Sequence, residues 1–256
     1  MPFTLRKWYV DVVTDDGRVA VAYWAALHAA GARYAVAGLV RGGAGATSSA
    51  FSLRASHGPR LLIDRLVWRA PSLGLDVSLL RLAPEVSQRL LDSPDGTVDW
   101  MAWAPAASVR LAIGDEVLEG EGYAERIDLT IAPWALPVRA LHWGRWVGGP
   151  RWAVWLRWEG SHPLCLAWLD GVPVPAPRVG EDGVDLGDSG RLALSERTTV
   201  TDASIGEQLT SLTTLSALID QVAQSRQLRW RSRGALTTPG APAVDGWAIH
   251  EAVRWG

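Results

Sequence analysis

Cysteine, strongly basic tracts and long apolar segments are scarce in this sequence of 256 residues. The single Cys165 excludes a disulfide within the chain, which fits a reducing compartment. No stretch approaches the ~20 apolar residues needed to span a bilayer. The opening MPFTLRKWYVDVV has no long apolar segment of the kind found in secretory signals. We therefore expect a soluble, cytoplasmic protein without a membrane span.

Positive charge is also limited, because 25 Lys and Arg stand against 27 Asp and Glu, for a formal net charge of −2. A phosphate-binding surface needs an excess of positive charge, and no basic tract with interleaved aromatics is present. Nucleic acid is therefore not an expected partner. The sequence indicates no oligomeric state.

The motifs of hydrolases, metal sites and nucleotide sites are missing as well. The five histidines, 28, 57, 142, 162 and 250, show no metal-ligand spacing with each other or with Cys165, and G-x-S-x-G is absent. The glycine-rich stretch Arg41–Ala46 lacks a following Lys-Ser/Thr and fits a solvated loop better than a phosphate loop. We expect neither a metal nor a cofactor.

Tryptophan, in contrast, is abundant, with 15 Trp against 2 Phe and 4 Tyr. In the run WAVWLRW, Trp152 and Trp158 share one face of a strand because side chains alternate along it. A buried indole N–H needs a hydrogen-bond partner, so Trp is rarely plain filler. The excess is consistent with a cavity walled by flat aromatics, the usual character of a small-molecule site. A hydrophobic small molecule is thus the expected partner.

Two carboxylates interrupt otherwise apolar strand faces. In GWAIHEAVRWG, Glu251 shares a face with Trp247 and Trp255, and in EGYAERIDLTI, Glu125 shares a face with Tyr123. Carboxylates are rarely buried without a partner. Each acid is therefore either paired with an arginine that fixes strand register or kept in a cavity for chemistry.

Short alternating runs separated by turn residues predict a mainly β fold, built as a sandwich or barrel. Asp15-Asp16-Gly17 predicts a hairpin turn, and separate strands are expected at 98–103 and 107–113. Ser204 and Glu207 form a capping-box pattern that opens one predicted helix near 204–223.

Four groups of motifs occur in a specific order along the chain. They are Trp8-Tyr9-Val10-Asp11 with Asp15-Asp16-Gly17, then Gly122-Tyr123-Ala124-Glu125, then Leu136-Pro137 with His142-Trp143-Gly144-Arg145-Trp146, and last Gly246-Trp247-Ala248-Ile249-His250-Glu251. This order resembles the carotenoid 1,2-hydratase and AttH-like family. The tocopherol cyclases and the fungal decalin-forming Diels–Alderases are more distantly similar.

The resemblance implies two lipocalin-like antiparallel β-barrel halves in tandem, here residues 1–135 and 136–256. It also implies a long apolar substrate whose alkene reacts inside a barrel. No residue matches the catalytic Asp of the hydratases, since Trp152–Gly160 offers only Glu159 near that place.

We therefore expect a cofactor-independent cyclase that acts on a polyene, polyketide or isoprenoid alkene, with a Diels–Alder reaction among the expected cyclisations. An alkene hydratase and a non-catalytic carrier are the alternatives, the carrier being favoured if Glu125 and Glu251 pair with Arg145, Arg157 or Arg254. The candidate catalytic residues are Glu125, Glu251 and Tyr123. The candidate substrate-binding residues are Trp8, Trp143, Trp152, Trp158, Trp247, Trp255, His250 and Arg145.

Overall fold

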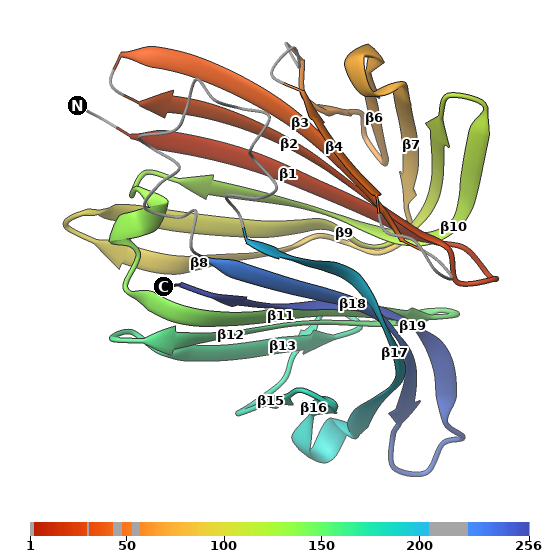
Figure 1. Ribbon diagram of the computed structural model, residues 1–256. Helices are drawn as coiled ribbons and strands as arrows, with labels where there is room; N and C mark the ends of the chain where they lie inside the picture. The colour runs from red at the N-terminus through yellow and green to blue at the C-terminus, as the bar shows by residue number, and fades with distance from the viewer. Residues whose placement is uncertain (1–2, 30, 43–47, 53–56, 205–224, 256) are drawn as a thin grey trace. The chain divides into compact units, whose positions relative to one another are not determined.

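The computed structural model describes residues 3–29, 31–42, 48–52, 57–204 and 225–255 (Figure 1). The chain divides into two compact units, the first reaching Leu136 and the second starting at Pro137. Each unit contains one antiparallel sheet, and the only helical segments in the described ranges are short 3-10 turns. The predicted mainly β, lipocalin-like class is confirmed. The predicted helix near 204–223 lies outside the described residues apart from Ser204, which ends a strand.

The sheet of the first unit has the order β4-β3-β2-β1-β10-β9-β7-β6-β5, and β8 pairs with β9 beside this path. Its elements are β1 (Thr4–Val13), β2 (Val19–Ala29), β3 (Ala32–Gly42), β4 (Ser48–Ser52), β5 (Arg60–Leu61), β6 (Arg65–Ala70), the 3-10 turn η1 (Pro71–Leu73), β7 (Leu75–Arg81), β8 (Val86–Ser93), β9 (Gly96–Ile113) and β10 (Glu116–Leu129).

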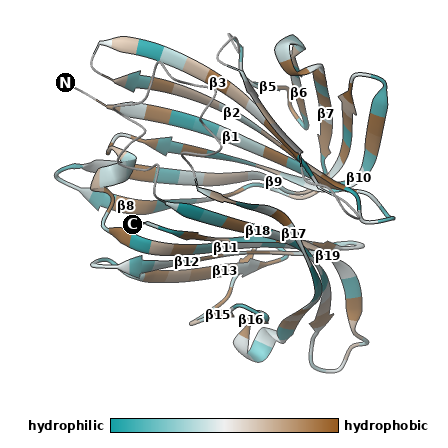
Figure 2. Ribbon diagram, viewed as in Figure 1, coloured by the Kyte–Doolittle hydropathy of each residue, from teal (hydrophilic) through white to brown (hydrophobic). Residues whose placement is uncertain are grey.

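Alternation along β1 determines which face of this sheet forms the core. Trp8, Val10 and Val12 belong to the apolar cluster of the first unit, together with Ala124 of the neighbouring strand β10. Figure 2 shows the apolar segments recurring along the strands. Because successive side chains point to opposite faces, the odd-numbered residues of β1 lie on the other side of the sheet. Burial of each large apolar side chain contributes about 1.5–3 kcal/mol.

The predicted hairpin at Asp15-Asp16-Gly17 is confirmed. It joins β1 to β2, and Gly17 adopts a φ of 82°, which glycine accepts without steric cost. The amide of Gly17 donates to the carbonyl of Thr14 over 2.8 Å. The carboxylate of Asp16 accepts hydrogen bonds from the Thr14 hydroxyl and from Arg18, and chiefly the Thr14 bond lowers its pKa.

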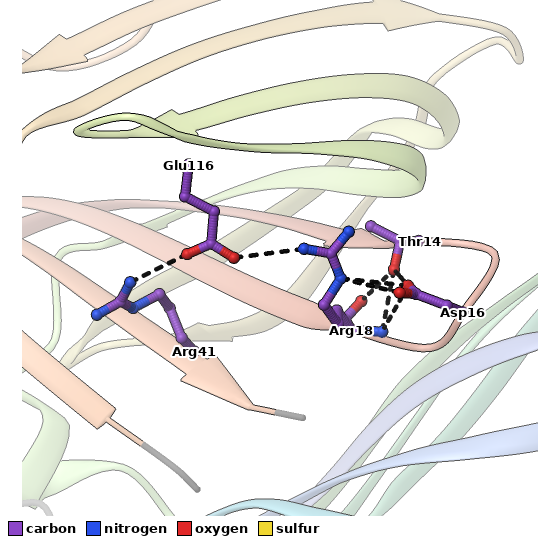
Figure 3. Close-up of polar contacts among 5 residues, drawn as sticks. All are labelled: Thr14, Asp16, Arg18, Arg41 and Glu116. Atoms are coloured by element: carbon purple, nitrogen blue, oxygen red, sulfur yellow. Dashed lines mark hydrogen bonds and ion pairs between the residues drawn. The ribbon is translucent and has the colours of Figure 1, made fainter. Parts of the chain in front are cut away.

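Ion pairs continue from this turn to neighbouring strands (Figure 3). The carboxylate of Glu116 lies 3.4 Å from Arg18 and 3.3 Å from Arg41, so it links the starts of β2 and β10 with the end of β3. All three side chains are exposed, and such pairs contribute at most about 1 kcal/mol each.

The two strands predicted at 98–103 and 107–113 are one strand, β9. Its first half pairs with β8 and its second half with β7, while β10 pairs along both halves. Pro105 lies between the two halves and has no N–H to donate to a neighbouring strand. Pairing on both edges carries the strand through this position.

The sheet of the second unit has the order β14-β13-β12-β11-β19-β18-β17-β16-β15. After the 3-10 turn η2 (Pro133–Ala135) its elements are β11 (Val138–Gly148), β12 (Arg151–Gly160), β13 (Leu164–Leu169), β14 (Val172–Pro173), β15 (Arg178–Gly180), β16 (Gly183–Asp185), the 3-10 turn η3 (Gly187–Ser189), β17 (Arg191–Ser204), β18 (Arg226–Thr237) and β19 (Val244–Arg254).

Trp146 is the largest fully buried side chain in the core of the second unit. It is fully buried in the apolar cluster with Ala153, Ala167 and Ala248. Its indole N–H donates to the carbonyl of Gly234 over 3.0 Å, which satisfies the buried donor. Small neighbours leave the volume that the indole fills.

Candidate functional site

Glu125 and Tyr123 lie on the face of β10 opposite the apolar cluster, because Ala124 between them belongs to that cluster. The Glu125 carboxylate accepts a 2.6 Å hydrogen bond from the indole N–H of Trp100 and a 2.8 Å bond from the Tyr123 hydroxyl. Both donors are buried. In both contacts Glu125 Oε2 is the acceptor.

Tyr123 remains a neutral hydrogen-bond donor. Its side chain is fully buried, and burial followed by the charge of Glu125 raises its pKa well above the ordinary value. Beside it, Tyr9 donates to Asp11 over 2.9 Å, and the rings of Tyr9 and Tyr123 meet edge to face at 6.0 Å. Two phenol–carboxylate pairs thus share one face of β1 and β10.

Trp8 belongs to the opposite face. It is 4% exposed within the apolar cluster, and the guanidinium of Arg126 lies 5.9 Å from its ring. The structure therefore does not bring Trp8 together with Glu125 and Tyr123, and its role in binding stays a prediction.

Glu251 is ion-paired in the second unit. Its carboxylate contacts the guanidinium of Arg229, which is 1% exposed, and accepts a 2.9 Å hydrogen bond from Gln227. The sequence pattern led us to expect an arginine as one of two alternatives, and the partner is Arg229 rather than any of the three arginines considered.

The face of β19 that carries Glu251 also carries Trp247. Arg145, fully buried, donates to the carbonyl of Trp247 over 3.1 Å, and Arg231 and Arg233 stack on its ring at 4.7 and 3.7 Å. These cation–π contacts stabilise the ring by about 0.5–2 kcal/mol each.

The other predicted tryptophans of this unit fall into two groups. Trp143, Trp152 and Trp158 are buried, and register places them on the same face as Trp247. Trp255 follows β19, and its backbone N–H donates to the backbone carbonyl of Arg139. It borders a hollow of about 480 Å³. Their contact with a ligand stays a prediction.

A cavity of about 220 Å³ opens on the core face of the second sheet. Its inner wall is one row of register partners across four strands, Trp155, Gly144, His250 and Trp230. Gly144 has no side chain, and a Cβ there would lie 2.8 Å from that of His250 and closer still to the Trp155 ring. The glycine of the HWGRW motif therefore makes room for the two rings.

The next row outward is more polar. It consists of Arg157, His142, Ala252 and Leu228, again in register. Arg157 contacts Glu159 and donates to the carbonyl of Val179. Of the predicted residues, His250, Trp143 and Glu251 border this cavity, although the side chains of Trp143 and Glu251 belong to the opposite face of the sheet.

Both imidazoles of the cavity are held in the neutral form. Burial, followed by Arg197 and His142, lowers the pKa of His250 to about 3. Burial, followed by Arg157, also lowers the pKa of His142. His250 Nε2 lies 2.9 Å from the hydroxyl of Ser232, and its ring lies 5.2 Å from that of Trp230. A neutral imidazole can donate one hydrogen bond and accept another.

Sequence reasoning missed Trp155, Trp230 and His142 as cavity residues. The alternation in WAVWLRW was correctly read, but the face with two tryptophans was chosen over the face with Trp155. Which face of a strand points into the sheet's concave side depends on pairing with strands that are far away in the sequence. His142 appeared in the sequence analysis as part of the HWGRW motif but not as a candidate site residue.

Among the described residues, no three His, Cys, Asp or Glu side chains are placed to hold a metal ion. Within the same ranges, no helix has the length and apolar character that crossing a membrane requires.

No family model and no curated protein sequence matches this chain. Several solved structures are similar to it, among them the following three. Kievitone hydratase from Nectria haematococca matches with a TM-score of 0.61 and 10% identity, over 97% of this chain and 88% of that chain. CghA matches with a TM-score of 0.58 and 13% identity, over 99% and 88%. A protein assigned as AttH from Nitrosomonas europaea matches with a TM-score of 0.54 and 10% identity, over 96% and 91%.

The chain has the fold of these proteins. The fold expected from the AttH-like motifs is thereby confirmed, although so few identical residues carry no activity from one protein to another. CghA has also been solved with Sch210972.

Proposed function

We propose that the protein is an enzyme that binds a hydrophobic polyene, polyketide or isoprenoid alkene and cyclises it to an isomer without a cofactor. The substrate site is the cavity of the second unit. The adjoining hollow of about 480 Å³ shares His142, Glu181 and Arg254 with it, so the two form one extended site. Trp155 and Trp230 form the apolar wall against which a polyene chain packs.

The observation that carries this proposal is the set of contacts made by the groups that could otherwise protonate an alkene. With a pKa of about 3, His250 is neutral near pH 7 and has no extra proton to give to an alkene. Glu251 is tied to Arg229, and Glu125 in the first unit accepts two hydrogen bonds. These groups suit orientation and hydrogen bonding better than protonation of carbon.

Catalysis then follows from enforced geometry. Holding the reacting carbons of one chain in contact can lower a barrier by up to about 7–11 kcal/mol in favourable cases. A hydrogen bond from His142 or from the guanidinium of Arg254 to a substrate carbonyl would make an attached alkene a better electron acceptor. Trp155 and Trp230 would keep the chain folded and water away.

Hydration is the second candidate reaction, because kievitone hydratase shares the fold. A carrier without catalysis is the third, and the ion pair of Glu251 with Arg229 favours it. One experiment separates the three. The purified protein is incubated with a panel of polyenes and isoprenoids in water and in heavy water, and the products are analysed by mass spectrometry.

Our proposal requires an isomer of unchanged mass with no deuterium on carbon. A product heavier by one water would replace the cyclase with a hydratase. Deuterium on a product carbon would mean that an acid starts the reaction. Saturable binding without conversion of any compound would support the carrier.

A further inference from the structure

A second, larger hollow of about 730 Å³ opens on the core face of the first unit. Register arranges its polar wall in rows across the strands. Thr4, His28 and Arg33 form the outermost row on β1, β2 and β3. Arg6 and Ala26 begin the next row, which continues through Asp128 on β10 to Asp99 on β9.

Small residues explain why this end of the barrel is hollow. Ala26 lies in the second row, its register partner on β3 is Ala35, and Ala37 pairs with Trp24 in the row below. Interiors of small barrels are normally filled by large side chains. Here Ala26, which borders the hollow, leaves the space open, and Trp24 gives it an apolar wall.

The charges at the hollow do not cancel. Three arginines and two aspartates border it, a formal excess of one positive charge. Asp128 lies 2.6 Å from Arg6 and 2.7 Å from Arg126, and Asp99 lies 2.8 Å from Arg89. Arg33 is exposed and makes no ion pair with the residues that the structure describes. Arg6 and Arg126 share Asp128, so Arg33, beside His28, is the arginine at this hollow that has no acidic partner among the described residues.

We propose that this hollow binds a long-chain monocarboxylate. The hydrocarbon chain packs on Trp24 and the alanine wall, and the carboxylate pairs with Arg33. An apolar floor below a rim that carries a guanidinium without an acidic partner matches an amphipathic ligand with a single negative charge. This site belongs to the first unit alone and does not depend on the reaction proposed for the second.

Photoreactive palmitic acid, with a diazirine in its chain, tests the location of binding. After irradiation, mass spectrometry should find the label on peptides from residues 4–42. Palmitate should compete with the labelling. Labelling confined to residues 137–255, or labelling that palmitate does not reduce, would overturn the proposal.

Matched variants test the role of charge. Arg33→Glu should weaken palmitate binding about tenfold, as expected for loss of a charge-assisted hydrogen bond. Arg33→Lys should stay close to the unmodified protein. Arg65→Glu, an exposed arginine of the same sheet that does not border the hollow, is the control and should have no effect.

Methyl palmitate completes the test because it has the same chain without the charge. Its binding should be indifferent to Arg33→Glu, whereas Ala26→Trp, which fills the hollow, should abolish binding of acid and ester alike. Thermal melting checks that Ala26→Trp folds, and Ala26→Leu replaces it if it does not. Equal affinity of palmitate for Arg33→Glu and for the unmodified protein would refute the assignment.

Discussion

Arg229 and Glu251 are register partners on the adjacent strands β18 and β19, and their side chains form an ion pair whose guanidinium is 1% exposed. A slip of one residue between the two strands would put the two side chains on opposite faces of the sheet. The ion pair therefore favours the observed register between β18 and β19 over a register shifted by one residue. Truncating one partner would leave the other charge buried with less compensation.

We predict that Glu251→Gln lowers the free energy of unfolding by about 3 kcal/mol, because the buried Arg229 loses its carboxylate. Urea unfolding followed by circular dichroism measures this loss. The matched control is Asp202→Asn, which breaks an exposed pair with Arg226 and should cost less than about 1 kcal/mol. A stable Glu251→Gln protein without turnover would instead make Glu251 catalytic.

Two replacements of Glu125 should distinguish the effect of its negative charge from the effect of its hydrogen-bond acceptor on stability. Glu125→Gln keeps a carbonyl that accepts from Trp100 and Tyr123, so stability should change by less than about 1 kcal/mol. Glu125→Leu removes the acceptor and should cost about 1–3 kcal/mol for each buried donor. Equal stability losses in the two variants would show that these hydrogen bonds do not govern the site.

Acid should destabilise the protein through His250. Its pKa is about 3 in the folded chain against 6.5 ordinarily, so below pH 6.5 the unfolded chain binds a proton that the native chain does not. The free energy of unfolding should fall by up to about 1.4 kcal/mol per pH unit between pH 6 and pH 4. Above pH 6.5 this contribution is fully retained.

The variant His250→Gln should have a shallower stability curve over that acidic range, as measured by urea unfolding at each pH. Gln in place of the exposed His162 provides the control and should leave the slope as it was. Parallel curves for His250→Gln and the unmodified protein would contradict the prediction.

A bound polyene should quench tryptophan fluorescence saturably, because Trp155 and Trp230 border the cavity. Replacing Trp230 with Phe should reduce the quenching amplitude. The change Trp158→Phe, on the opposite face of the same sheet, should not. If only Trp158→Phe reduces quenching, the ligand lies on the face that the sequence pattern favoured.

The sequence by itself determined the local features of this protein. The hairpin at Asp15-Asp16-Gly17 was predictable because a turn depends on the φ values of neighbouring residues. The mainly β class and the shared face of Trp152 and Trp158 followed from the two-residue period of a strand. Each of these properties is fixed by residues close together in the chain.

Tertiary structure alone decided what each face meets. Alternation cannot say which face curls toward the core, because that depends on pairing between strands far apart in sequence, as between β11 and β19. Arg229 became the partner of Glu251 for the same reason, although other arginines were equally good candidates by composition. Likewise, the continuity of β9 through Pro105 rests on the strands that flank it.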